Sequence, residues 1–287
     1  HLPFSLRASW QQLTWPLAGD PMVSTRNGNV ELIGNLERYR LALQTSIHGE
    51  QIPAGDWTLL AQGNFEGLLI ERLDGATLDG RLTASGRLAW TDGFSWDVQL
   101  ALDGLDPGQQ WPEFPGRLRG RLASTGAVSD KGWQLSARTM DLGGELRGYP
   151  LALRAELAKD FADRWDVRQL QLASGETRIE LRGTLTEVWD IDGRFQLPQP
   201  QALLPEAAGS ASGRFRLGGA LATPDVEFTV SGRGLSWQDT LSLGEVRLEG
   251  RIVELGQGAS RLQWQMARLT AGEQLLPRIE GRLEGSL

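Results

Sequence analysis

The sequence contains no cysteine, which excludes disulfide bonds, thiol nucleophiles and cysteine metal ligands. It contains only two histidines: His1 is terminal, and His48 ends an alternating run beside a glycine. Catalysis by a histidine-based triad and the usual zinc sites therefore lack their residues. A chain without cysteine suits a compartment that oxidises stray thiols, which favours the bacterial envelope.

Basic residues are fewer than acidic ones, and lysine occurs only at Lys131 and Lys159. The net charge of −7 argues against nucleic-acid binding, because phosphate contacts need a basic face. Phosphate-loop and nucleophile-elbow motifs are absent, and most carboxylates lie in turns or at polar strand positions. We therefore predict that the protein is not an enzyme and needs no cofactor or metal.

No apolar run approaches the roughly 20 residues that span a bilayer. Instead, apolar and polar residues alternate, as in the segment 94–102, which is typical of strands with one apolar face. Asp-Gly pairs at 74–75, 92–93, 103–104 and 192–193 predict turns between short antiparallel strands. The expected fold is all-β, with short helical turns only within Pro107–Phe114 and Pro198–Ala208.

Glycine falls in phase with the apolar residues, as in the segment 80–90. The triplet Gly-Arg-(Leu/Phe/Ile) recurs at Gly80, Gly86, Gly116, Gly120, Gly193, Gly213, Gly250 and Gly281. Two interpretations stay open: the glycines let an antiparallel sheet curve strongly, or they thin one face and leave room for a ligand. The two are compatible, because a curved sheet encloses a groove.

A longer repeat has the form apolar-Pro-x-x-x-Gly-x-apolar-x-Gly-x-apolar, with copies centred on Pro112, Pro205 and, more loosely, on Pro277 to Leu287. The unequal spacing of the copies suggests modules with insertions. We expect three modules of one elongated groove, at residues 1–110, 111–204 and 205–287. The chain begins at His1 and stops within a pattern, so we expect a segment of a longer protein.

Tryptophan is abundant, and Trp90, Trp96 and Trp264 lie in the apolar phase, where core packing is favoured over lipid contact. Three motifs resemble the TamB family of AsmA-like, bridge-type lipid transport proteins: Trp10-Gln-Gln-Leu-Thr-Trp-Pro-Leu17, Leu217-Gly-Gly-Ala-Leu-Ala-Thr-Pro-Asp-Val226 and the Pro-Glu-x-x-Gly repeats. The resemblance covers essentially the whole chain, and each motif alone has low specificity.

This resemblance implies a periplasmic segment of a protein that is anchored in the inner membrane outside this stretch. It implies a sheet folded lengthwise into a trough (a β-taco) with an apolar interior that carries phospholipid acyl chains. It also implies assembly of outer-membrane barrel proteins with TamA, through regions outside the chain.

The predicted groove residues are those of the apolar phase: Phe94, Trp96, Val98, Leu100, Leu102, Leu118, Leu122, Ile179, Leu181, Leu185, Phe215, Leu217, Val226, Phe228, Val230, Leu262 and Trp264. The alternatives are a structural or adhesin-type β-helix, an outer-membrane barrel and a carbohydrate-active β-sandwich enzyme. The chain has few of the asparagines of β-helix ladders and only two tyrosines for a membrane girdle.

Overall fold

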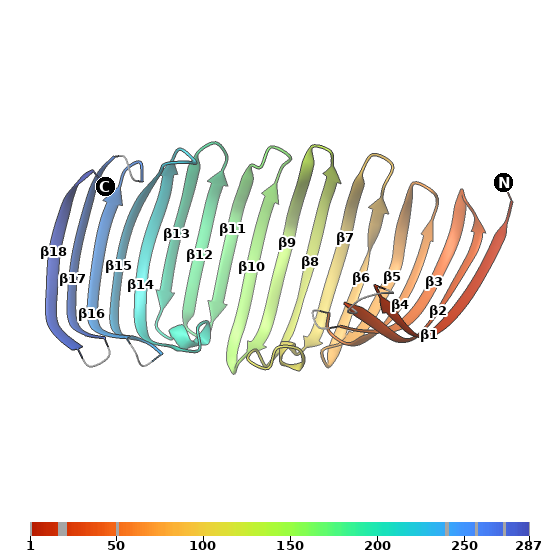
Figure 1. Cartoon of the computed structure of the whole chain (residues 1–287), viewed down its shortest axis with the longest axis horizontal. Helices are drawn as coiled ribbons and strands as arrows, with labels where there is room; N and C mark the ends of the chain where they lie inside the picture. The colour runs from red at the N-terminus through yellow and green to blue at the C-terminus, as the bar shows by residue number, and fades with distance from the viewer. Residues whose placement is uncertain are drawn as a thin grey trace. The chain divides into compact units, whose positions relative to one another are not determined.

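The computed structural model describes residues 2–16, 22–49, 52–238, 241–255, 258–271 and 274–286. His1, Leu17 and Leu287, which belong to the terminal and motif predictions above, lie outside these ranges. The chain divides into two units, His1–Gly148 and Tyr149–Leu287. Within the described ranges the regular structure is strand, apart from two short 3-10 helices (Figure 1). The all-β prediction is confirmed.

The first unit contains nine strands, each antiparallel to the next along the chain. They are β1 (Phe4–Trp15), β2 (Val23–Asn35), β3 (Arg38–His48), β4 (Gly55–Gly63), β5 (Gly67–Thr77), β6 (Gly80–Ala89), β7 (Phe94–Leu105), β8 (Gly116–Ser129) and β9 (Gly132–Leu146). The 3-10 helix η1 (Pro107–Gln109) lies between β7 and β8.

The second unit repeats this arrangement with nine further antiparallel strands in chain order. They are β10 (Tyr149–Lys159), β11 (Trp165–Ser174), β12 (Thr177–Leu185), β13 (Trp189–Leu197), β14 (Ala207–Gly219), β15 (Pro224–Trp237), β16 (Leu241–Ile252), β17 (Ala259–Ala271) and β18 (Gln274–Ser286). The 3-10 helix η2 (Pro200–Ala202) lies between β13 and β14.

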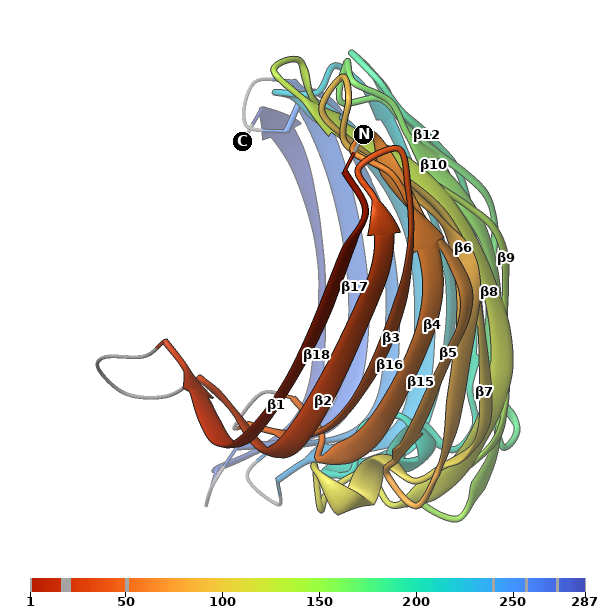
Figure 2. The same cartoon turned by 90° about the vertical axis from the view of Figure 1, so that its right-hand side faces the viewer.

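The strands of each unit bend along their length, so each sheet has a concave and a convex side (Figure 2). Irregular register accompanies the bend: pairing shifts between Ile70 and Leu73 in the first unit and between Val167 and Leu170 in the second. Such bulges bend a strand and increase its local twist. The prediction of a strongly curved antiparallel sheet is confirmed for each unit.

Three of the four predicted Asp-Gly turns are wrong. The pairs at 74–75, 103–104 and 192–193 lie inside β5, β7 and β13, and only Asp92-Gly93 lies in a hairpin connection. Inside β5 and β13, the aspartate alternates in step with the polar residues of the strand, and the glycine alternates in step with the apolar residues. A real turn is formed at Leu78-Asp79, where both residues have positive φ (49° and 55°), as in the type I′ hairpin.

The two predicted helical stretches contain helix, but each is only one short 3-10 turn. Asp106 caps η1, because its carboxylate accepts hydrogen bonds from the amides of Gly108 (2.9 Å) and Gly116 (2.8 Å). Pro112 and Pro205 follow the two 3-10 turns and precede β8 and β14, whereas Pro277 lies inside β18. The first two repeat copies thus share a structure, and the three-module division stays a prediction.

Candidate functional site: the two faces of the sheets

The described apolar residues form almost no sealed core. Those that are buried are Ala61, Leu105, Ala137, Ala155, Ala202 and Val246, most of them small. The chain exposes 18481 Å² of accessible surface. A compact protein of its 31.5 kDa mass exposes about 12,000 Å², and two separate compact halves about 14,600 Å² together. The excess agrees with sheets of a single layer, because the described strands of a unit form no second sheet against the first.

Cross-strand pairing arranges the apolar residues of the first unit in rows that run from strand to strand. Two inner rows are almost purely aliphatic. One row contains Ala8, Val30, Leu43, Leu59, Leu73, Ala84, Leu100, Leu122 and Met140, and the other contains Leu6, Leu32, Leu41, Ala61, Ile70, Gly86, Val98, Ser124 and Ala137. The aromatic residues Trp10 and Trp57 lie in the row on one side of this band, and Tyr39 and Trp96 in the row on the other.

The second unit has corresponding rows, and four of its aromatic residues lie within the two inner ones, whereas Trp165 and Trp189 lie outside them, in a row with Leu185. One row contains Leu153, Leu172, Ile179, Phe195, Gly213, Val230, Leu248, Trp264 and Gly281. The neighbouring row contains Ala155, Leu170, Leu181, Gly193, Phe215, Phe228, Gly250, Leu262 and Leu283.

Apart from Trp165 and Trp189, each of these aromatic rings lies over a glycine of the neighbouring strand, an arrangement that we call a ring–glycine pair. The pairs are Trp10–Gly28, Tyr39–Gly63, Trp57–Gly75, Trp96–Gly126, Phe195–Gly213, Phe215–Gly193, Phe228–Gly250 and Trp264–Gly281. A methyl group on Gly126 would lie 2.1 Å from Cζ2 of Trp96, and one on Gly193 would lie 2.2 Å from Cζ of Phe215. At these positions the space above the glycine is filled by the protein's own ring, so the interpretation that the glycines leave room for a ligand is wrong there.

Hydroxyl groups fix two of the rings at their edges. Nε1 of Trp10 donates to Oγ1 of Thr25 (2.7 Å), and Nε1 of Trp96 donates to Oγ of Ser124 (3.1 Å). Ser124 is buried although it stands in an aliphatic row, and this bond explains its presence there. Sequence reasoning missed Ser124 and Thr25, because nothing in the alternation distinguishes a ring-anchoring hydroxyl from any other small residue.

The predicted groove residues all lie in strands, and all are half-buried except Phe94, which is 43% exposed. Register brings Leu181, Phe215, Phe228 and Leu262 into one row, and Ile179, Val230 and Trp264 into the next. Leu217 pairs directly with Val226. Their contact with lipid stays a prediction. Trp90 lies just after β6, where its Nε1 donates to the carbonyl of Phe65 (2.7 Å).

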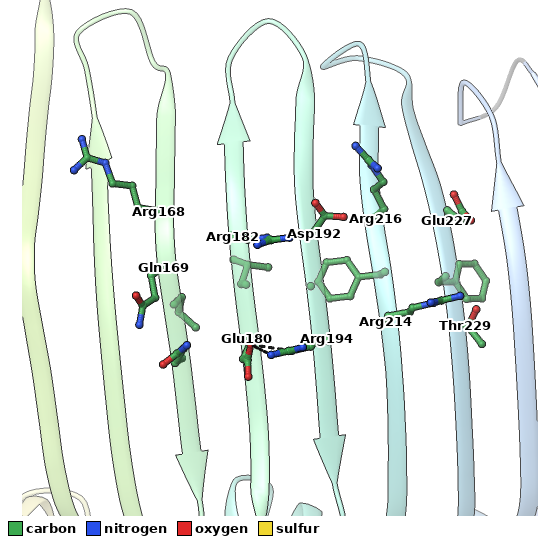
Figure 3. A pocket seen from close by; sticks show the side chains of 16 residues that line it. Arg168, Gln169, Glu180, Arg182, Asp192, Arg194, Arg214, Arg216, Glu227 and Thr229 are labelled. Atoms are coloured by element: carbon green, nitrogen blue, oxygen red, sulfur yellow. Dashed lines mark hydrogen bonds and ion pairs between the residues drawn. The ribbon is translucent and has the colours of Figure 1, made fainter.

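The opposite face of the second unit is polar and carries a shallow depression of about 660 Å³ (Figure 3). Its charged lining residues are Arg168, Glu180, Arg182, Asp192, Arg194, Arg214, Arg216 and Glu227. Nε of Arg194 donates to Glu180 (2.8 Å), and Arg168 binds Glu156 (2.6 Å). These side chains are exposed, so this face is a solvated surface, and ion pairs of this kind contribute little stability.

The described residues with a shifted pKa belong to exposed ion pairs, to the η1 cap and to the turn at Asp160. The guanidinium of Arg72 lowers the pKa of Asp74 by hydrogen bonding, and Arg282 does the same to the pKa of Glu284. The pKa of Asp106 is lowered chiefly by its hydrogen bond from the Gly116 amide. Within the described ranges no group of acidic residues or histidines has the arrangement of a metal site. The described part of the chain also holds no helix long and apolar enough to cross a bilayer.

The sequence matches the family described as "TamB, N-terminal domain" over residues 1–287. The chain belongs to the TamB family. It is 26% identical over 244 residues to the translocation and assembly module subunit TamB of Haemophilus influenzae, which covers 85% of this chain. The chain spans about a fifth (19%) of the length of that TamB protein. No solved structure matches it.

Proposed function

We propose that the apolar face of each unit is the lining of a hydrophobic groove that carries phospholipid acyl chains through the periplasm. The observation that carries this proposal is the half-buried state of large residues along whole rows, such as Phe215, Phe228 and Leu262. A globular protein seldom leaves an apolar patch of this extent without a binding role. The membership of the TamB family adds support, because the related TamB protein is a translocation and assembly module subunit.

The shape of the sheets agrees with this proposal. The strands appear in opposite left-to-right order in Figures 1 and 3, so the two views look at opposite sides of the second unit. Figure 2 shows that the side facing the viewer in Figure 1 is the concave one. Figure 3 thus views the second unit from its convex side, and we propose that the apolar rows line the concave side.

The energetics suit a sliding cargo. Each buried methylene gains about 0.8 kcal/mol, so a chain of about fifteen methylenes gains roughly 12 kcal/mol at most. The apolar rows offer a nearly uniform surface without a charged cluster, so no single position would trap the lipid. We infer that the groove recognises hydrocarbon and is indifferent to the head group.

For the whole protein we propose the role implied by the family. A part outside this chain anchors it in the inner membrane, another part engages TamA, and the assembly serves outer-membrane barrel proteins, lipid transport or both. The protein acts as a conduit and scaffold, with no chemical step of its own.

Two alternative folds are contradicted by the strand pairing. A β-helix stacks parallel coils, whereas the strand pairs within both units are antiparallel. A β-sandwich enzyme needs a second sheet packed on the first, and neither unit contains one among its described residues.

The proposal is tested by extracting lipid from the purified full-length protein and identifying it by mass spectrometry. Val98 and Gln99 are neighbours in β7 on opposite faces and provide matched variants. Phospholipid is expected with the parent and with Gln99→Asp, and a strong reduction is expected with Val98→Asp, because a charge in a dry groove is costly.

The proposal fails if no phospholipid copurifies, or if both variants lose it equally. It also fails if Val98→Asp unfolds the whole protein, because the apolar rows would then be an ordinary sealed core.

A further inference from the structure

Bulky aromatic rings stand in rows that must stay open if the sheet forms a groove. A Phe or Trp side chain standing on a strand would project from the sheet and obstruct a groove. In the ring–glycine pairs the partner of each ring across the strand pair is glycine. The ring occupies the place of the missing side chain and so lies in the layer of the sheet surface.

In five of the pairs the ring is the first obstacle that a side chain on the glycine would meet. The three atoms nearest to an added methyl group are all ring atoms at Gly28, Gly75, Gly126, Gly193 and Gly281. The closest approaches run from 2.1 Å at Gly28 and Gly126 to 2.4 Å at Gly75. Contacts this short cannot exist, so a methyl group would force the ring away from the sheet. No φ value at these five glycines demands the absence of a side chain.

The geometry points to a specific role for these five glycines: they set the clearance of the groove by letting the aromatic ring of the neighbouring strand lie flat. This inference rests on the proposed function and deepens it. A flat ring presents its face, which adds contact area for an extended hydrocarbon chain without reducing the depth available to it. The edge bonds of Trp10 to Thr25 and of Trp96 to Ser124 hold two of the rings in that orientation.

The occupant that fits such a floor is a single layer of extended acyl chains. A folded protein segment brings side chains of varied size and polar backbone groups, which a smooth apolar floor without hydrogen-bond partners does not satisfy. The two inner rows of the second unit contain four of the ring–glycine pairs, so clearance there depends most on the glycines.

The test uses the full-length protein in cells, with a photo-reactive residue in place of Val226. Val226 pairs with Leu217, which lies two residues after Phe215 on the same face of β14. Phospholipid captured at this position is measured by mass spectrometry for Gly193→Ala, for Gly193→Ala with Phe215→Leu, and for Gly218→Ala. Gly218 is the matched control, because a methyl group there meets only one atom, at 3.9 Å.

We expect Gly193→Ala to reduce capture about fivefold or more, as overpacking displaces the ring. The double variant should restore capture, because the smaller Leu side chain leaves the floor low, and Gly218→Ala should behave as the parent. Unchanged capture in Gly193→Ala overturns the inference and leaves the proposed function intact. A loss that the double variant does not restore also overturns it. No capture in the parent overturns the proposed function itself.

The proteolytic resistance of each variant shows whether it folds. If Gly193→Ala does not fold, Gly126→Ala with and without Trp96→Leu provides the same comparison in the first unit, with the photo-reactive residue at Val98. Unfolding of both glycine variants overturns the inference, because the glycines would then serve the fold rather than the groove.

Discussion

Each of the two units contains an antiparallel sheet of the same kind, but the aromatic rings lie at different positions in the two sheets. In the first unit, Trp10, Trp57, Tyr39 and Trp96 flank two aliphatic rows. In the second unit the corresponding inner rows contain Phe195, Phe215, Phe228 and Trp264. Every one of these rings nevertheless lies over a glycine.

This difference shows which feature of the rings is shared by the two units and which one varies. The position of these eight rings along the strand differs between the units, whereas all eight pair with glycine; Trp165 and Trp189 pair with Leu185 instead. A ring in the middle of the sheet and a ring at its side therefore meet the same condition, namely that neither projects above the sheet. The comparison identifies the ring–glycine pair, rather than any single residue, as the structural element of the groove.

The largest effect on stability is expected from removing a central ring. Phe228→Ala in the second unit should lower the free energy of unfolding by about 2 kcal/mol, and Leu100→Ala in the first by about 1 kcal/mol, because both side chains are only half-buried. Urea unfolding measures both, and Thr229→Ala serves as the control on the polar phase. Costs of about 3–5 kcal/mol at both sites would indicate a sealed core and contradict the account.

The second effect is the loss of lipid capture when a ring is raised above the sheet, and its size should differ between the units. Gly126→Ala raises a ring at the side of the aliphatic rows, so lipid capture at Val98 should fall only about twofold, less than the loss expected at Val226 for Gly193→Ala. Photo-crosslinking in the same cells compares the two. An equal loss in both units would show that the position of the ring along the strand has no effect on lipid capture.

A smaller effect is expected from the ion pairs on the polar faces. Glu180→Gln removes the negative charge that pairs with Arg194 in the second unit, and Glu31→Gln removes the one that pairs with Arg7 in the first. These side chains are largely exposed, so each change should lower the free energy of unfolding by about 0.5 kcal/mol. This loss should vanish at high salt. Urea unfolding at two salt concentrations tests this, and a loss of several kcal/mol would show that the polar face is covered by a partner.

The smallest effect is local and depends on pH. The pKa of Asp106 is lowered in the folded state, so its stabilisation of η1 is present above its unfolded pKa of about 3.9 and is lost as pH falls through the folded value. The helix η2 has no such cap, since Gln199 makes no side-chain capping bond. The amide resonance of Gly116 should titrate in acid and that of Leu203 should not. Asp106→Asn should abolish the titration, and persistence of it would contradict the assignment.

Much of the fold follows from the alternation of apolar and polar residues. The strand phase, the antiparallel arrangement and the two short helical stretches could all be predicted, because a period of two and proline-bounded segments are local signals. Three of the Asp-Gly pairs were wrongly predicted as turns, because a pair such as Asp192-Gly193 fits both a turn and the alternation of a strand. In the structure the pair lies inside β13, where Gly193 pairs with Leu181 and Phe215 on the two neighbouring strands.

The ring–glycine pairs themselves could not be read from the sequence. Trp10 and Gly28 face each other only because of the register in which β1 pairs with β2. A shift of one residue would move the glycine to the other face. The long-range partner of each aromatic residue therefore depends on pairing that no local pattern specifies.

The most direct test of the central claim is photo-crosslinking at adjacent residues of opposite phase, carried out in cells with the full-length protein. Val98 and Gln99 in β7, and Phe228 and Thr229 in β15, provide one pair in each unit. The account predicts that a photo-reactive residue at Val98 or Phe228 captures phospholipid and that one at Gln99 or Thr229 does not. Equal capture on both faces, or none at Val98 and Phe228, would contradict it.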